Sequence, residues 1–205
     1  MIRRFLERLV TGRGEPAGPA ATTVHEMRGL RVVVENSRPD IATADVLARL
    51  DEALGLLERY APARLRHLRR DLRQISVVRF PCRGAYFPEE RVCVTELTFL
   101  ARRDITAAPV ASSILHEGVH ARVDRMGVRR EGRDRAKEER LCRRAEVAFG
   151  RALPPELGAP VLERALGTLT LADTEVAPVI DWAEASRRQS EIDAASTRPP
   201  SPPNA

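Results

Sequence analysis

Two runs of residues with high β-propensity lie near the middle of the chain, one on each side of a segment rich in proline and glycine. The runs are QISVVRF and RVCVTELTFL, and PCRGAYFPEE separates them. Val, Ile, Thr and Phe favour strands, whereas Pro and Gly favour turns. A helical pattern follows from Val110 to about Met126 and ends at Gly127. The chain is therefore expected to place two neighbouring strands immediately before a long helix.

Most of the remaining chain has apolar residues at helical spacing. Aromatic residues make up only 4% of the 205 positions, so any core must be built mainly from aliphatic side chains. This predicts the α+β class: a mostly helical domain with a small sheet that precedes the helix at 110–126. The other expected elements are a strand within GLRVVVEN and helices at Thr43–Tyr60, Ala63–Leu72, Arg135–Leu153 and Val161–Arg188, the last with breaks around Gly167 and Pro178.

The two ends of the chain differ in composition from its middle. Residues 1–23 begin with an amphipathic stretch and continue into a linker rich in Gly, Pro and small residues. Residues 24–193 are expected to form one domain, because 43% of the chain is hydrophobic, enough for a single core. Residues 194–205 include STRPPSPPNA, which predicts a disordered, proline-rich tail.

Charge and cysteine usage argue against several classes of protein. The net charge is +5, but 34 basic residues are interleaved with 29 acidic ones, so we expect no specific nucleic-acid binding. Three widely spaced cysteines without a CxxC pair predict neither a disulfide framework nor a thiolate zinc site. No stretch approaches the roughly 20 apolar residues of a transmembrane helix. We therefore expect a cytoplasmic protein, and nothing in the pattern indicates its oligomeric state.

The helix at 110–126 contains the string HEGVH, in which His116, Glu117 and His120 are the chemically active residues. Residues four apart lie on one face of a helix with Cβ atoms about 5–6 Å apart, so the two histidines can bind one ion. Glu117 lies beside that ion, where it can accept a proton from water whose pKa zinc lowers toward about 7. The alternative is that both histidines are ordinary helix residues. We expect a catalytic Zn2+ site because strands precede this helix and carboxylates follow it.

A catalytic zinc site needs a third protein ligand and one open position. The candidates on the next predicted helix are Glu138, Glu139 and Glu146, each of which is otherwise a solvated residue of a charged helix. Glu139 begins a stripe with Cys142 and Phe149 at helical spacing, which favours it as the ligand. Since a helix turns about 100° per residue, Glu138 is expected to point elsewhere. Glu146 is a candidate for orienting a ligand histidine.

These residues resemble the zincin metallopeptidases, and among them the gluzincins, in which HExxH on one helix is completed by a Glu from a following helix. The chain is also similar to small uncharacterised bacterial proteins in which an ExxC segment follows, matched here by Glu139 to Cys142. The resemblance covers residues 74–153. It implies a sheet whose edge strand holds an extended substrate, and cleavage of a peptide bond by zinc-activated water.

Several positions of the chain differ from the sequence patterns of these families. Val123 and Met126 stand where the metzincin branch has Gly and a third His, which excludes that branch. Arg143 stands where some gluzincins have an Asp that orients a ligand histidine. No histidine follows His120, so the residue that stabilises the transition state must be of another type, and Tyr86 or an arginine is a candidate.

The sequence therefore predicts a zinc-dependent metallohydrolase, specifically a peptidase that acts on a peptide or protein substrate. His116, His120 and Glu139 are its expected zinc ligands, and Glu117 is its expected general base. One alternative is a non-catalytic binding or scaffold protein with a zincin-like fold and a structural or weak metal site. Another is a basic nucleic-acid-associated factor, whose affinity for nucleic acid would fall steeply with salt.

Overall fold

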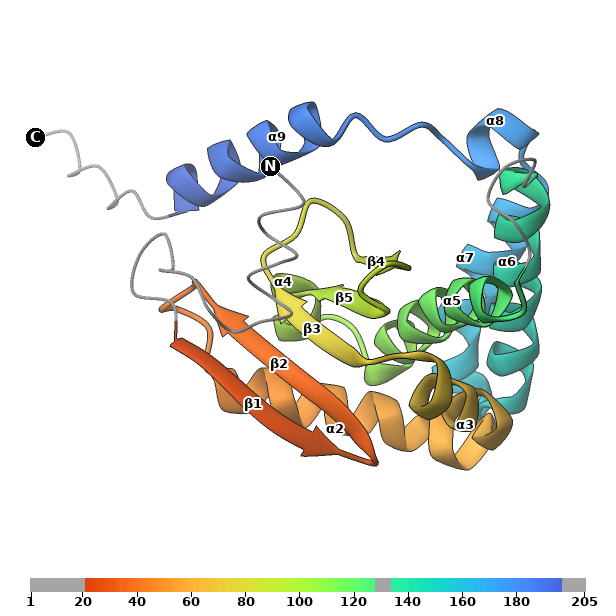
Figure 1. Cartoon of the computed structure of the whole chain (residues 1–205), viewed down its shortest axis with the longest axis horizontal. Coiled ribbons are helices and arrows are strands. Elements are labelled where there is room, and N and C mark those ends of the chain that lie inside the picture. The colour runs from red at the N-terminus through yellow and green to blue at the C-terminus, as the bar shows by residue number, and fades with distance from the viewer. Residues whose placement is uncertain (1–20, 128–133, 197–205) are drawn as a thin grey trace, which may run out of the picture.

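The computed structural model describes residues 21–127 and 134–196 (Figure 1). The predicted amphipathic segment, most of the linker and the proline-rich end of the tail lie outside the described residues. In the described part, a small mixed sheet is surrounded by a larger number of helices, so the predicted α+β class is confirmed.

Five strands form one sheet in the order β1, β2, β3, β5, β4. Their bounds are Ala21–Met27 (β1), Leu30–Asn36 (β2), Gln74–Val78 (β3), Gly84–Phe87 (β4) and Val92–Glu96 (β5). Strands β2, β3 and β5 are parallel, and the outer strands β1 and β4 are antiparallel to their neighbours. Strands β3 and β5 are buried along their whole length, as expected of parallel strands covered on both faces. The predicted neighbours are thus confirmed as β3 and β5.

The first two strands form a tight hairpin that the sequence analysis did not predict. Residues 21–23, expected to end the linker, are the first residues of β1 and pair with β2. Arg28 and Gly29 connect the strands with φ angles of 48° and 71°. Two consecutive positive φ values are typical of the type I′ turn, whose twist matches that of a hairpin. Strand β1 was not predicted because an Arg-Gly pair is a weaker turn signal than Asn-Gly or Asp-Gly.

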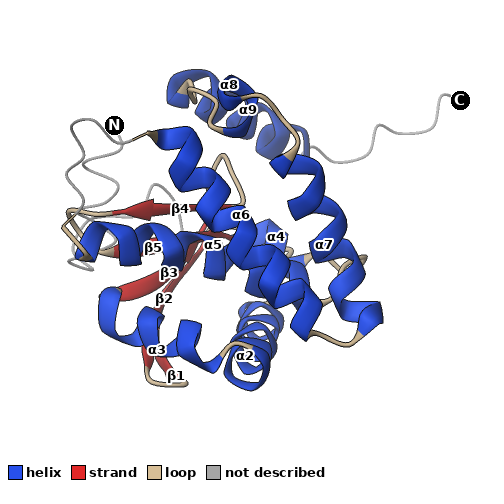
Figure 2. Ribbon diagram, turned by 90° about the vertical axis from the view of Figure 1, so that its right-hand side faces the viewer, coloured by secondary structure: helices blue, strands red, loops and turns tan. Residues whose placement is uncertain are grey.

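Helices cover the sheet and form a layer beside it (Figure 2). Their bounds are Thr43–Tyr60 (α2), Pro62–Asp71 (α3), Leu97–Ala101 (α4), Ala107–Arg125 (α5), Arg135–Ala152 (α6), Pro155–Leu169 (α7), Asp173–Val176 (α8) and Trp182–Ser196 (α9). Helix α5 lies at the centre, in contact with α2, α3, α6 and strands β4 and β5. No helix of the described part combines the length and apolar character that crossing a membrane requires.

Two expected segments are divided differently in the structure. The run RVCVTELTFL, predicted as one β-prone segment, changes from strand to helix at Glu96, whose side chain accepts a hydrogen bond from the Phe99 backbone N–H at 2.7 Å. This cap ends β5 and begins α4. The turn-rich loop before it contains a short strand, β4, which sequence reasoning missed because four residues carry little periodic signal. The expected long helix from Val161 is divided into α7, α8 and α9.

The C-terminal helix α9 crosses the end of the sheet near β3 and β4 (Figure 1). The Trp182 ring lies 5.5 Å from the Phe80 ring, and Arg79 donates to Asp193 at 2.8 Å. These contacts fix both ends of the described part of α9. The helix includes residues 194–196, which the sequence predicts as the start of the tail.

Gly118, the middle residue of HEGVH, allows α3 to pack closely on α5. A Cβ atom added at Gly118 would lie 2.3 Å from Leu68 Cδ2, far inside van der Waals contact. Leu68 is fully buried in the main hydrophobic core, so its side chain has little room to move. The glycine therefore determines how closely the two helices approach, and so where the motif lies relative to the sheet.

Gly118→Val is expected to lower the free energy of unfolding by about 1–3 kcal/mol, because the added methyl groups would overlap Leu68 in a filled core. The matched control is Gly167→Val in α7, where an added Cβ meets nothing within 4 Å. Urea unfolding of both variants measures the difference. Equal stability changes in the two variants would show that helix propensity, and not close packing, explains the effect.

Candidate metal centre

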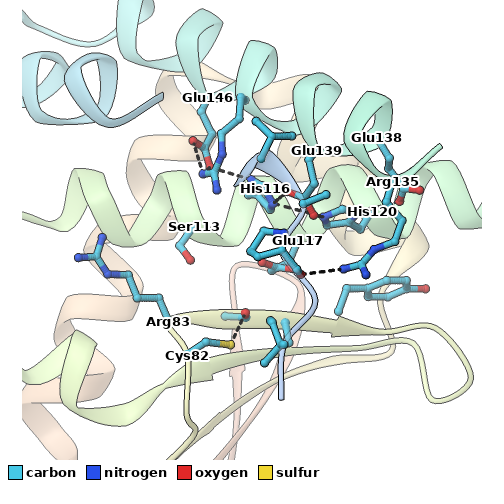
Figure 3. Close-up of a pocket in the computed structure, with 18 of the residues that line it drawn as sticks. Cys82, Arg83, Ser113, His116, Glu117, His120, Arg135, Glu138, Glu139 and Glu146 are labelled. Atoms are coloured by element: carbon cyan, nitrogen blue, oxygen red, sulfur yellow. Dashed lines mark hydrogen bonds and ion pairs between the residues drawn. The ribbon is translucent and has the colours of Figure 1, made fainter. Parts of the chain in front are cut away.

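His116 and His120 lie on the same face of α5 and line one pocket (Figure 3). Their Nε2 atoms are 3.2 Å apart. Two nitrogens bound to one tetrahedral zinc ion at about 2.0–2.1 Å lie about 3.3 Å from each other. The structure therefore brings the two imidazoles of the sequence motif to the separation that shared coordination requires.

Each imidazole is held at its other nitrogen by a glutamate from α6. His116 Nδ1 lies 2.9 Å from Glu146 Oε1, and His120 Nδ1 lies 2.7 Å from Glu138 Oε1. A carboxylate at Nδ1 can only accept, so it keeps the proton on that nitrogen. When the rings are neutral, both Nε2 lone pairs are then free to bind an ion, the arrangement usual for zinc-bound histidines.

Glu139 faces both Nε2 atoms at once. Its Oε2 lies 3.1 Å from His116 Nε2, and its Oε1 lies 3.3 Å from His120 Nε2. Each distance is close to the nitrogen–nitrogen separation, and because the two distances belong to different oxygens, the carboxylate as a whole spans the two imidazoles. Glu139 is thus placed where the sequence analysis expects the third ligand.

The orientation of Glu138 differs from the expected one. Adjacent glutamates on a helix point about 100° apart, which predicts that Glu138 points elsewhere. In the structure both glutamates contact His120, because the ring presents its two nitrogens on different edges: Glu138 meets Nδ1 and Glu139 meets Nε2. The two glutamates can therefore point in different directions and still contact the same imidazole ring.

Cys142 is a donor that the sequence analysis noted only as part of a stripe. Its Sγ is buried and lies 3.6 Å from His120 Nε2, close to the nitrogen–sulfur separation in a tetrahedral zinc site, about 3.5 Å. The donor atoms of His116, His120 and Cys142 all lie within 4.8 Å of one another. This buried His-His-Cys group can hold a metal ion. The signal that could have found it was its position one helical turn after Glu139.

The imidazoles and the carboxylates of the site shift one another's pKa values. Burial lowers the pKa of His116, but hydrogen bonds that it donates to Glu139 and Glu146 outweigh burial and raise the pKa to about 10. The pKa of His120 is also raised well above its usual value, because Cys142, Glu138 and Glu139 together outweigh burial. Burial raises the pKa of Glu139, yet the two imidazoles lower it by more. The anionic groups around the two rings thus favour positive charge at this point.

Glu117 lies one residue further round the helix and lines the same pocket. It is 8% exposed, and within the described residues its carboxylate has no hydrogen-bond or ion-pair partner. Strand β4 passes close by: a Cβ on Gly84 would lie 3.4 Å from Glu117 Cγ and 3.1 Å from Ser113 Oγ. Glycine at this position leaves the space beside the carboxylate open.

The pocket around these residues has a volume of about 800 Å3. Its walls come from the loop and strand at 82–88, from α5, α6 and α7, and from the segment between α8 and α9. Strand β4 is an edge strand of the sheet, and its outer side has no strand partner in the described part of the chain. Tyr86, a candidate from the sequence, lies in the pocket wall, and its hydroxyl is 3.3 Å from Asp124 Oδ2.

Comparison of the chain with models of protein families, with curated proteins and with solved structures found no match. Any function must therefore be inferred from the residues and geometry of the pocket. Nitrogen, carboxylate and thiol donors converge at one point within it, and an unpartnered carboxylate lies beside them.

Proposed function

We propose that the protein is a zinc-dependent metallohydrolase, specifically a peptidase, in which His116, His120 and Glu139 bind the ion. One observation carries the proposal: the two Nε2 atoms lie 3.2 Å apart, and each lies 3.1–3.3 Å from one of the two Glu139 oxygens. Two ligands of one tetrahedral zinc ion, each about 2.0–2.2 Å from the metal, have such a separation. The glutamates on both Nδ1 atoms support it further, since such partners fix the orientation of metal-bound imidazoles.

Zinc is the proposed ion because of the donor types. Imidazole nitrogens with a carboxylate and a nearby thiol suit zinc, whereas calcium and magnesium prefer sites built from oxygen. The free cysteines Cys82, Cys93 and Cys142 agree with a reducing compartment. We therefore propose that the protein acts in the cytoplasm.

Different residues of the pocket have different roles in the proposed hydrolysis. A bound zinc ion supplies a Lewis acid that makes water nucleophilic near neutral pH. Glu117 accepts the proton of the attacking water, because its carboxylate faces the pocket without another partner. Glu146 and Glu138 keep the two imidazoles in the tautomer that presents Nε2. The unpaired edge of β4 offers backbone groups to an extended peptide, the substrate class that the resemblance to zincins implies.

Cys142 favours a second candidate function, a non-catalytic scaffold with a structural metal. Structural zinc sites are closed by four protein ligands, whereas catalytic sites keep one position open. Because the thiol lies 3.6 Å from His120 Nε2, it is an additional buried donor within reach among the described residues. The two functions therefore differ in a single ligand, which can be measured.

Purified protein is expected to contain about one zinc per chain, because two imidazoles and a carboxylate are already positioned to bind it. Element analysis and zinc titration give the stoichiometry. His120→Ala should lower the zinc content, whereas His25→Ala, a control in strand β1, should leave it unchanged. The proposal fails if the protein contains less than about a tenth of an equivalent and takes up no zinc on titration.

A further inference from the structure

One end of the pocket is lined by arginines from three different elements. Arg83 precedes β4, Arg143 lies on α6 and Arg164 lies on α7, and the Ser113 side chain lines the pocket with them. Figure 3 shows Arg83 and Ser113 on the opposite side of the metal-binding residues from Glu138. We call Arg83, Arg143 and Arg164 the arginine end of the pocket.

Two members of the arginine end have no anionic partner. Arg143 is engaged by Glu146, since its Nη1 donates to both carboxylate oxygens at 3.0 Å. The Arg83 Cζ lies 5.1 Å from the centre of the Phe99 ring in a cation–π contact, and such a contact does not require any of the guanidinium N–H donors. Among the residues that the structure describes, no acceptor meets the side chain of Arg83 or Arg164.

The charge balance of the pocket favours an anion once a metal is bound. The lining contains four arginines and four glutamates. Three of those glutamates contact the histidines. With neutral histidines, a divalent ion adds two positive charges that the lining does not neutralise. An anionic ligand is therefore attracted to the pocket as a whole, and to the unpaired guanidiniums in particular.

Arg164 lies near the other charges of this end. Its pKa is lowered, chiefly by loss of solvent, and the charges of Arg143 and Arg83 add to that effect, while Glu146 and Glu117 oppose it. The residue as a whole is exposed, so its guanidinium is accessible to a ligand from solvent, and the like charges of Arg143 and Arg83 favour an anionic one. Arginine meets a carboxylate with two parallel hydrogen bonds, which also fixes the orientation of the ligand.

We propose that the arginine end binds a carboxylate of the substrate through Arg164 and Arg83, with the Ser113 hydroxyl as a further donor. This deepens the proposed function and rests on it. The substrate is then an acidic peptide, in which the carboxylate belongs either to the C-terminus or to an Asp or Glu side chain close to the cleaved bond.

Peptide hydroxamates test this, because the hydroxamate binds zinc and the rest of the molecule can be varied. Three probes of equal length are compared: a neutral one with an amidated C-terminus, one with a free C-terminal carboxylate, and an amidated one with an Asp side chain. Calorimetric titration of the zinc-loaded protein should show a carboxylate probe binding about 10- to 100-fold more tightly than the neutral probe. The carboxylate probe that binds more tightly shows whether the recognised carboxylate is the C-terminus or a side chain.

Arg164→Gln and Arg83→Gln should each remove most of the preference for a carboxylate probe. Arg164→Lys should remove part of it, because lysine keeps the positive charge but cannot form two parallel hydrogen bonds to a carboxylate. Arg135→Gln, an arginine elsewhere in the pocket wall, is the control and should keep the preference. Equal binding of all three probes overturns the proposal, and so does an equal loss in Arg135→Gln and Arg164→Gln.

The zinc proposal can fail separately from this one. In that case the protein takes up no zinc, and the neutral hydroxamate binds no better than the corresponding amide. The same comparison is then made with the three peptides in their amide form on zinc-free protein. A preference for a carboxylate that Arg164→Gln removes supports the arginine end without the metal, whereas no preference overturns it.

Discussion

Glu117→Gln is expected to leave zinc bound and to lower the rate of peptide hydrolysis by about 100- to 10,000-fold, the usual contribution of a general base. Glutamine keeps the shape of the side chain but cannot accept a proton at neutral pH. Its effect on metal affinity should be small, because in the structure Glu117 contacts neither Nε2 atom and the three donor groups come from other residues.

The measurement requires a peptide library that includes acidic sequences, and proteins matched for zinc content. Glu163→Gln, an exposed position on α7, is a control for the same chemical change outside the pocket and should keep full activity. Equal turnover by wild type and Glu117→Gln would remove Glu117 from the mechanism. Absence of turnover in zinc-loaded wild type would favour the scaffold function instead.

Local patterns were sufficient to predict much of the helical part of this fold. The helix at Thr43–Tyr60 has the predicted bounds, and α6 differs from its prediction by one residue, because apolar spacing and terminating residues act within a few turns of chain. Strands β1 and β4 could not be predicted in this way. Each is an edge strand whose conformation depends on pairing with one neighbour, and that information is not local.

The same difference between local pattern and tertiary packing applies to the candidate site. The spacing of HEGVH fixes the relation of His116 to His120, since both lie on one helix. The contacts between α5 and α6 depend on how two helices pack, so the sequence could only offer Glu138, Glu139 and Glu146 as alternatives. All three turn out to contact the histidines, at different nitrogens. No local sequence pattern predicts the arginine end, because its residues come from three different elements.

Glu139→Ala is expected to weaken zinc binding by more than about 100-fold, a larger loss than either neighbouring glutamate should cause. Of the imidazole nitrogens, Glu138 and Glu146 contact only Nδ1 atoms, and removing such an orienting partner typically costs about 10- to 100-fold in metal affinity. Zinc titrations of the three alanine variants give this order. Because an ion bound only to the folded state stabilises it, Glu139→Ala should also lose most of the zinc-dependent rise in melting temperature.

Cys142→Ala completes the comparison, since the thiol and Glu139 compete for the remaining positions around the ion. In an open, catalytic site only Glu139 is the third ligand, so Cys142→Ala should keep nearly full affinity. Cobalt-substituted protein should then lack the thiolate-to-metal charge-transfer absorption that a coordinated cysteine produces. If that absorption is present and Cys142→Ala abolishes it, four protein groups surround the ion and the site is closed. If Cys142→Ala or Glu138→Ala loses more zinc affinity than Glu139→Ala, Glu139 is not the third ligand.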